Sequence, residues 1–463
     1  MEKTAEDVPV TPAGRMFLHP DMDNVISCAI GLQNPIDIEA LKSDIKNSIM
    51  IQHPRFRSLF VKDKHGREHW RLTTRVNLEN HVFVRDIKGN DDDDEDIVNE
   101  YLADLAVSSP LAFDKPLWEV HILRKQKCFV LRVHHALGDG ISLMSLFLAC
   151  CTKVDQTNTV ARDKSSFTSS STEKSIPGIA KKAWRLVMVV VFTFIYVLKF
   201  IGRSLGVKDG KSVITGGDGV ELWPRKLATA KFNLEDMKKV KSAITGGTVN
   251  DVLFGVISSG LARYLEVRLP NETQEGLQIT GLAMVNLRKQ PGLQEMSNLM
   301  KNGSVSRWGN QFGFFLLPIY HHKDVGDPLS YVKRAKAMLD RKKLSLEAHF
   351  SYSIGKLVMS LFGPKVATLL NRKVICNTSF TISNILGPQE EIMISGNPMV
   401  YIRVNTSSLS HAITMHMVSY TGKAEMQILV AKDIIPDPKF LAKCFEDALL
   451  QMRDAATTAP QIH

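Results

Sequence analysis

Apolar and polar residues alternate along two neighbouring segments in the first third of the chain. KPLWEVHILR (115–124) and CFVLRVHH (128–135) have this pattern, and the turn-like KQK separates them. Alternation with a period of two predicts strands, so we expect two strands joined by a tight connection. The next residues, ALGDGISLMSLFLACC (136–151), predict a turn followed by a helix.

Apolar residues at helical spacing dominate two segments later in the chain. TVNDVLFGVISSGLARYLEVR (248–268) predicts a helix whose start can be capped by the Thr248–Asp251 region. PDPKFLAKCFEDALLQMRDAA (436–456) predicts an amphipathic helix that closes the chain. We therefore expect two α/β regions, residues 1–153 and 216–463, with an insert at 154–215 between them.

The insert has two parts of different character. Residues 155–178 are rich in Ser, Thr and charge and predict a flexible linker. The stretch Leu186–Leu198 that follows has no charged residue. As a helix it would rise about 20 Å, against about 30 Å for the bilayer core. Flanking Arg185 and Lys199 could extend it by reaching outward, so we favour a membrane-associated segment at about 183–205 over a buried core helix.

Composition narrows the class of protein. The chain has 463 residues, of which 44% are hydrophobic and 23% charged, as in globular proteins of two to four domains. The net charge of +10 suits an anionic partner, such as a phosphate-bearing substrate or an acidic membrane surface. No basic stripe with interleaved aromatic residues is present, so we expect no nucleic-acid partner. Six cysteines without zinc spacing predict reduced thiols in the cytosol, and the first residues contain no secretory signal.

The candidate chemistry lies at His134-His135-Ala136-Leu137-Gly138-Asp139-Gly140, where a strand ends and a helix begins. A histidine suits proton abstraction from an alcohol because its ordinary pKa is about 6.5. Side chains alternate along a strand, so His134 and His135 should face opposite ways, and the pattern does not choose between them. Asp139 could cap the next helix or pair with a cation, and Gly140 permits a close approach that a Cβ would obstruct. The alternative is a surface histidine pair followed by an ordinary Asp-Gly turn.

Other catalytic signatures are missing from the sequence. It has no GxSxG elbow, no HExxH motif and no complete P-loop, so it predicts no serine hydrolase, zincin or nucleotide-binding loop. The acidic run Asp91–Asp96 lacks calcium-loop spacing and is best interpreted as a solvated loop. We expect no metal and no cofactor.

Six segments together resemble the wax ester synthase/diacylglycerol acyltransferase family, especially its plant branch. They are PLWEVHIL (116–123), HHALGDG (134–140), NDVLFGVISSGL (250–261), VNLR (285–288), GNQFGFFLLPI (309–319) and SNILGPQEEI (383–392). HHxxxDG alone is shared with peptide-synthetase condensation domains, whereas the ordered set is far more specific. Asn384-Ile385-Leu386-Gly387-Pro388 departs mildly from the family's NVPGP-like segment.

The resemblance implies two chloramphenicol-acetyltransferase-like halves with a tunnel at their interface. It implies an O-acyltransferase that moves a fatty acyl group from acyl-CoA, as co-substrate, to a fatty alcohol or diacylglycerol. The family pattern makes His135 the general base, with Asp139, His134 and Gly140 supporting the motif. Asn250 and Asp251 match the family's ND motif, and Pro116, Leu117 and Trp118 its PLW motif, which makes the latter candidates for the substrate channel.

The reaction needs no protein nucleophile, so we expect a ternary complex without an acyl-enzyme. If the apolar stretch crossed the bilayer once, His135 and Asn250 would lie on opposite sides and could not share a tunnel. We therefore expect both halves in the cytosol at the endoplasmic reticulum membrane, with the plasma membrane as the alternative. Competing interpretations are a non-lipid HHxxxDG acyltransferase or condensation enzyme and a catalytically silent membrane scaffold.

Overall fold

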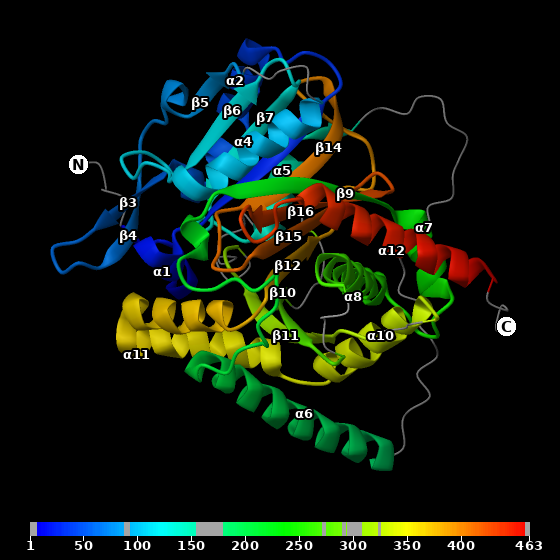
Figure 1. Ribbon diagram of the computed structural model, residues 1–463. Helices are drawn as coiled ribbons and strands as arrows, with labels where there is room; N and C mark the ends of the chain where they lie inside the picture. Colours follow the sequence, from blue (N-terminus) through cyan, green and yellow to red (C-terminus); the bar gives the residue numbers. More distant parts are fainter. Residues whose placement is uncertain are drawn as a thin grey trace.

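The computed structural model of the chain describes residues 7–87, 93–153, 179–270, 275–288, 293, 308–322 and 326–458. The predicted linker at 155–178 and part of the acidic run Asp91–Asp96 lie outside these residues. Two large sheets form the centre of the molecule, and helices cover them (Figure 1).

The first sheet has seven strands in the order β5 (Val82–Arg85), β6 (Trp118–Leu123), β7 (Cys128–His134), β2 (Val25–Leu32), β14 (Asn397–Thr406), β13 (Ile392–Ile394) and β8 (Thr152–Lys153). The second has six, in the order β11 (Phe312–Tyr320), β10 (Gln278–Asn286), β12 (Phe380–Ile385), β15 (Ile413–Tyr420), β16 (Lys423–Ala431) and β9 (Arg225–Asn233). A small third sheet contains β1 (Val8–Pro9), β4 (Glu68–Leu72) and β3 (Ser58–Lys62).

The helices of the first half are α1 (Pro12–Phe17), α2 (Ile38–Asn47), α3 (Ile49–Gln52), α4 (Asp94–Ser108) and α5 (Gly140–Ala149). Those that follow are α6 (Ile179–Leu205), α7 (Leu234–Ser242), α8 (Val249–Arg268), α10 (Leu329–Lys343), α11 (Glu347–Cys376) and α12 (Pro438–Thr458). Short 3-10 turns lie at Pro20–Met22, Pro54–Arg57, Leu78–Asn80 and Val220–Leu222. The structure confirms the predicted strand pair, the helix after the HHALGDG segment and the helices near 248–268 and 436–456.

The two sheets do not follow the predicted boundary between the halves completely. β14 belongs to the second half by sequence, yet it pairs with β2 of the first sheet from Met399↔Leu32 to Thr406↔Ile26. β13 joins the same sheet and pairs with β8. The second half therefore contributes strands to the first, and the two halves form one interlocked unit.

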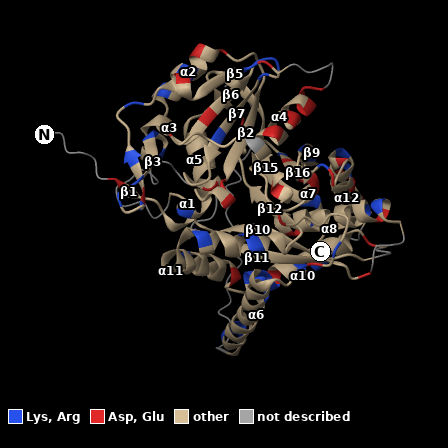
Figure 2. Ribbon diagram, turned by 60° about the vertical axis from the view of Figure 1, so that its left-hand side comes forward, with Lys and Arg blue, Asp and Glu red and all other residues tan. Residues whose placement is uncertain are grey.

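The predicted apolar segment is the helix α6, which runs along the outside of α10 and α11 (Figure 1). Only 11% of its most apolar window is buried, and Figure 2 shows it protruding with few charged residues along its middle. α11 is a second helix long and apolar enough to cross a membrane, which the sequence analysis did not single out. A break at Gly363, with φ of 76°, precedes Pro364 within it. By length and composition, the described chain thus has two candidate membrane helices.

Candidate active site

A cavity of about 190 Å³ lies between the two large sheets. Its walls come from β2, β7 and β14 of the first sheet and from β10, β12 and β15 of the second. Most lining side chains are apolar, among them Met16, Phe17, Ile26, Leu131 and Val133. His135 lies on this wall, on the same face as Leu131 and Val133, as strand alternation predicts.

The ring of His135 is held on two sides. It stacks on Phe17 with a centroid distance of 4.2 Å. Asn310 Nδ2 donates to the His135 carbonyl oxygen at 2.9 Å, so the other end of that amide, Oδ1, faces His135 Nδ1 at 3.1 Å. Oδ1 can only accept, so Nδ1 carries the proton and Nε2 keeps its lone pair. This is the tautomer that a general base needs.

Burial keeps the His135 imidazole neutral. It lowers the pKa of His135 to about 4, and this effect outweighs the opposing influence of Asp139 and of hydrogen bonds to the ring. A ring that is neutral near pH 7 can accept a proton without first losing one.

His134 faces the other way, and its contacts are structural. Its Nδ1 accepts from the Ala136 N–H at 3.1 Å, so Nε2 donates to Asp23 Oδ1 at 2.9 Å. The side chain is only 1% exposed and does not line the cavity. Of the two histidines, His135 therefore lines the cavity and His134 does not.

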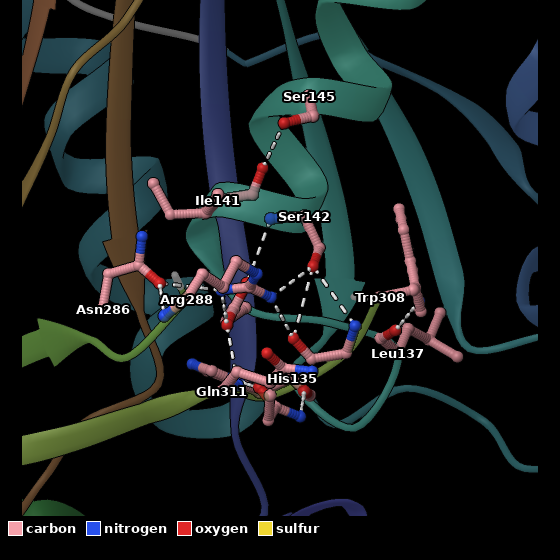
Figure 3. A network of polar contacts seen from close by, with 12 residues as sticks. His135, Leu137, Ile141, Ser142, Ser145, Asn286, Arg288, Trp308 and Gln311 are labelled. Atoms are coloured by element: carbon pink, nitrogen blue, oxygen red, sulfur yellow. Dashed lines mark hydrogen bonds and ion pairs between the residues drawn. The ribbon is translucent and has the colours of Figure 1, made fainter. Parts of the chain in front are cut away.

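Asp139 joins the two halves near His135, and Figure 3 labels its partners Ser142, Arg288 and Gln311. It caps α5 by accepting from the Ser142 N–H at 3.0 Å. It also accepts two hydrogen bonds from Arg288, at 2.7 and 3.0 Å, and one from the Gln311 N–H at 3.0 Å. Both expected roles of Asp139, cap and partner of a cation, therefore occur together. The sequence analysis did not assign Arg288 or Asn310. Arg288 lies 149 residues after Asp139, and Asn310 lies 175 residues after His135.

Gly140 lies where the second half packs most closely against α5. A Cβ built on it would come within 2.5 Å of Ile385 Cδ1, so the close approach expected at this glycine is present. Ile385 follows Asn384 in the segment that departs from the family's NVPGP-like pattern. Both residues line the cavity.

Asn250 and Asp251 lie at the start of α8, outside the cavity wall. Asp251 and Thr248 form a capping box, with Thr248 N–H donating to Asp251 Oδ2 at 2.7 Å. Asn250 Oδ1 accepts from Asn384 Nδ2 at 2.9 Å. The pair therefore holds the helix start and, through Asn384, one cavity-lining side chain.

Pro116, Leu117 and Trp118 lie apart from this cavity. Leu117 and Trp118 are fully buried, and the Trp118 indole donates to the Phe56 carbonyl at 3.0 Å and stacks on His81. None of the three residues lines a described cavity. Leu117 and Trp118 therefore pack in the protein core and do not form the expected channel wall. Both faces of β6, which begins at Trp118, are buried.

Two further polar side chains on the wall were missed by the sequence analysis. Asn24 is 5% exposed and His416 is 7% exposed, and both line the cavity. Among the described residues, none hydrogen-bonds to Asn24 Oδ1 or to His416 Nδ1. Burial and the nearby His135 lower the pKa of His416 to about 4. In the described part of the chain, no group of three or more His, Cys, Asp or Glu is placed to hold a metal ion.

Two α/β halves with a cavity between their sheets define the class of chloramphenicol-acetyltransferase-like folds. Residues 26–253 match the wax ester synthase/diacylglycerol acyltransferase catalytic domain, and residues 308–453 match the WS/DGAT C-terminal domain. The chain belongs to the wax ester synthase/diacylglycerol acyltransferase family.

A curated relative supports the family, and solved structures support the fold. Wax ester synthase/diacylglycerol acyltransferase 11 of Arabidopsis thaliana is 33% identical, over 98% of this chain and 96% of the relative. The wax ester synthase/diacylglycerol acyltransferase from Marinobacter aquaeolei VT8 superposes with a TM-score of 0.60 at 15% identity, covering 97% of this chain and all of that one. The first condensation domain of the CDA synthetase gives 0.58 at 13% identity, over 98% and 97% of the two chains.

Proposed function

We propose that this chain transfers a fatty acyl group from acyl-CoA to a long-chain alcohol, to diacylglycerol or to both. One observation carries the proposal: a neutral imidazole, His135, lines a mostly apolar cavity with its Nδ1–H directed at Asn310. The family supplies the substrate classes, and the cavity's apolar walls suit an alkyl chain.

The reaction then follows from the lone pair on His135 Nε2. The substrate hydroxyl gives its proton to Nε2 while its oxygen forms a bond to the thioester carbonyl carbon. The tetrahedral intermediate collapses, the carbon–sulfur bond breaks, and the protonated His135 returns the proton to the departing CoA thiolate. No side chain is acylated, so both substrates occupy the cavity together.

We also propose that the protein lies on a membrane with both halves on its cytosolic side. Large apolar side chains are exposed along α6 and α11, among them Trp184, Phe194, Leu198, Leu361 and Phe362. The stretch at 357–369 on α11 precedes Asn371 and Ile375 of the same helix, which line the cavity. An apolar acceptor dissolved in the bilayer would therefore meet the enzyme near its cavity.

Contacts on the inner face of α6 favour a helix that lies against the protein. The Lys342 ammonium, itself paired with Glu347 at 2.6 Å, lies 3.7 Å from the Tyr196 ring centroid. Arg203 is 6% exposed and donates to Asp209 at 2.6 Å and to Thr280 at 3.0 Å. These contacts fix the helix near its middle and near its end. The helix would lose them if it crossed the bilayer alone.

The activity can be tested in microsomes that contain the protein, with radiolabelled acyl-CoA and with hexadecanol and diacylglycerol in competition. Labelled wax ester or triacylglycerol is the expected product. Acylation of soluble amines without any acylation of lipid alcohols would support the condensation-type alternative. Absence of turnover across acyl chain lengths would support a silent scaffold.

The topology can be tested by protease protection in sealed microsomes. Epitopes placed at the two chain ends should both be digested without detergent, as expected for two cytosolic halves. Protection of only one end would contradict the proposal.

A further inference from the structure

Asn24 and His135 lie opposite each other, one residue beyond the paired ends of β2 and β7. Val25 of β2 pairs with His134 of β7, and the His135 N–H donates to the Asn24 carbonyl at 2.8 Å. Residues directly opposite each other on antiparallel strands have Cβ atoms about 4.5–5.5 Å apart and project to the same face. Both side chains line the same cavity, so Asn24 is the nearest cross-strand neighbour of the proposed base.

The carboxamide of Asn24 is buried without a partner for its oxygen. The residue is 5% exposed, and no described residue hydrogen-bonds to Oδ1. A buried carboxamide oxygen without a partner is unfavourable, so such a group on a cavity wall is available to pair with a ligand. The carboxamide can present either its NH₂ or its oxygen to the cavity by turning about its last bond.

Asn24 also lies where two cavities meet. A second cavity, of about 260 Å³, shares Met22, Asn24, Ile375 and Leu409 with the first. Asn24 therefore lines both cavities, whereas His135 lines only the first.

We propose that Asn24 is a catalytic residue whose Nδ2–H donates a hydrogen bond to the thioester carbonyl oxygen as it becomes an oxyanion. The inference rests on the proposed function and supplies the donor that the transfer needs. The hydroxyl oxygen must lie within hydrogen-bonding distance of His135 Nε2, and the carbonyl carbon about 3 Å beyond it. An amide one cross-strand position away from His135 reaches the oxygen on that carbon. Asn24 gains and loses no proton during the reaction.

His416 is the competing donor. It lies on β15 of the opposite sheet, and its Nδ1 has no partner among the described residues. The ladder places Asn24 directly beside His135, whereas His416 reaches the cavity from the opposite wall. The assignment to Asn24 therefore predicts that His416 affects turnover less than Asn24 does.

The decisive variant is Asn24→Asp, which keeps the size of the side chain but replaces its NH₂ donor with a second oxygen. Loss of one oxyanion donor lowers kcat by about 10²–10³. We expect that loss for Asn24→Asp and Asn24→Ala, with little change in KM for either substrate. A long-chain alkyl trifluoromethyl ketone, which adds water to form a tetrahedral gem-diol, should also bind the Asn24→Ala variant more weakly than the wild type.

Asn405→Ala is the matched control. Asn405 is 1% exposed and both of its amide atoms lack partners among the described residues. It lies on β14 between Val404 and Thr406, which line the cavity, so its side chain points to the other face. Its replacement should leave kcat unchanged.

Three results would overturn the inference while the wild type remains active. The first is folded Asn24→Asp and Asn24→Ala proteins with wild-type kcat. The second is an effect confined to KM. The third is a large loss of kcat in His416→Leu without a loss in the Asn24 variants. A wild type inactive towards every lipid alcohol would instead contradict the proposed function.

Discussion

At the scale of single residues, one strand end separates two adjacent histidines into different environments. His135 faces an apolar cavity, while His134 is enclosed and hydrogen-bonded to Asp23. The alternation of side chains along β7 produces this division without any special backbone geometry. The identity of the base therefore depends on which face of the strand adjoins the second sheet.

Asn310 is expected to position the base. Replacing it with Leu removes the acceptor for the His135 Nδ1–H, so the proton can move to Nε2 and the ring can turn. We expect kcat to fall by about 10- to 100-fold, a part of the 10²–10⁴ that a positioned base contributes. Steady-state kinetics with both substrates checks this, and circular dichroism confirms folding. An unchanged kcat would show that the Asn310 contact is not needed to orient the ring.

Only part of this site could be predicted from the sequence. The strand-turn-helix context and the capping role of Asp139 are local features, so the pattern of residues reveals them. Arg288, Asn310 and Asn24 reach the site through tertiary contacts, and no local periodicity signals them. The PLW segment shows the reverse case. The motif suggested that Trp118 lines the substrate channel, whereas the structure buries this residue in the core.

At the scale of elements, α5 and β12 approach closely at Gly140. Gly140→Ala places a Cβ 2.5 Å from Ile385 Cδ1, so the end of the Ile385 side chain must turn aside, and we expect a loss of about 0.5–1.5 kcal/mol, the usual cost of a displaced rotamer. Ile385→Val lacks Cδ1, so the double variant should regain part of that stability. Urea denaturation of the four proteins measures the coupling. Equal losses in both backgrounds would exclude Ile385 as the cause.

Elements with one clear periodicity were predictable, and interrupted ones were not. The capping box and apolar stripe of 248–268 predict α8 to within a residue of its start. α11 escaped notice because Gly363, Pro364 and scattered lysines break its apolar run. Its exposed face becomes evident only when the fold shows that little of it is covered.

At the scale of the whole molecule, buried histidines should make the protein sensitive to mild acid. Burial lowers the pKa of His53, His135 and His416 to about 4 and that of His411 to about 3, from 6.5. The unfolded chain binds these protons first, so the stabilisation is complete above pH 6.5 and declines as the pH falls towards 4.

Urea titrations between about pH 7.5 and 4.5 would measure this decline. Glu119, whose pKa is lowered to about 2 by His121, Lys115 and Arg132 against the opposing effect of burial, contributes a later loss, below its ordinary value of 4.5. A free energy of unfolding that stayed constant from pH 6.5 to 5 would contradict the histidine contribution.

The interlocked halves explain why the two-part organisation was only partly predictable. The residues of β14 are adjacent in sequence to the second half, yet they complete the first sheet against β2. Long-range pairing of this kind leaves no local signature, because any alternating strand could join either sheet. The same crossing fixes the cavity walls relative to each other.

The most direct test of the central claim compares His135→Ala and His134→Ala in acyl transfer to hexadecanol. If His135 is the base, its replacement should lower kcat by about 10²–10⁴ in a folded protein, and the His134 variant should lose far less activity. A folded His135→Ala protein with near wild-type transfer would contradict the assignment of the active site.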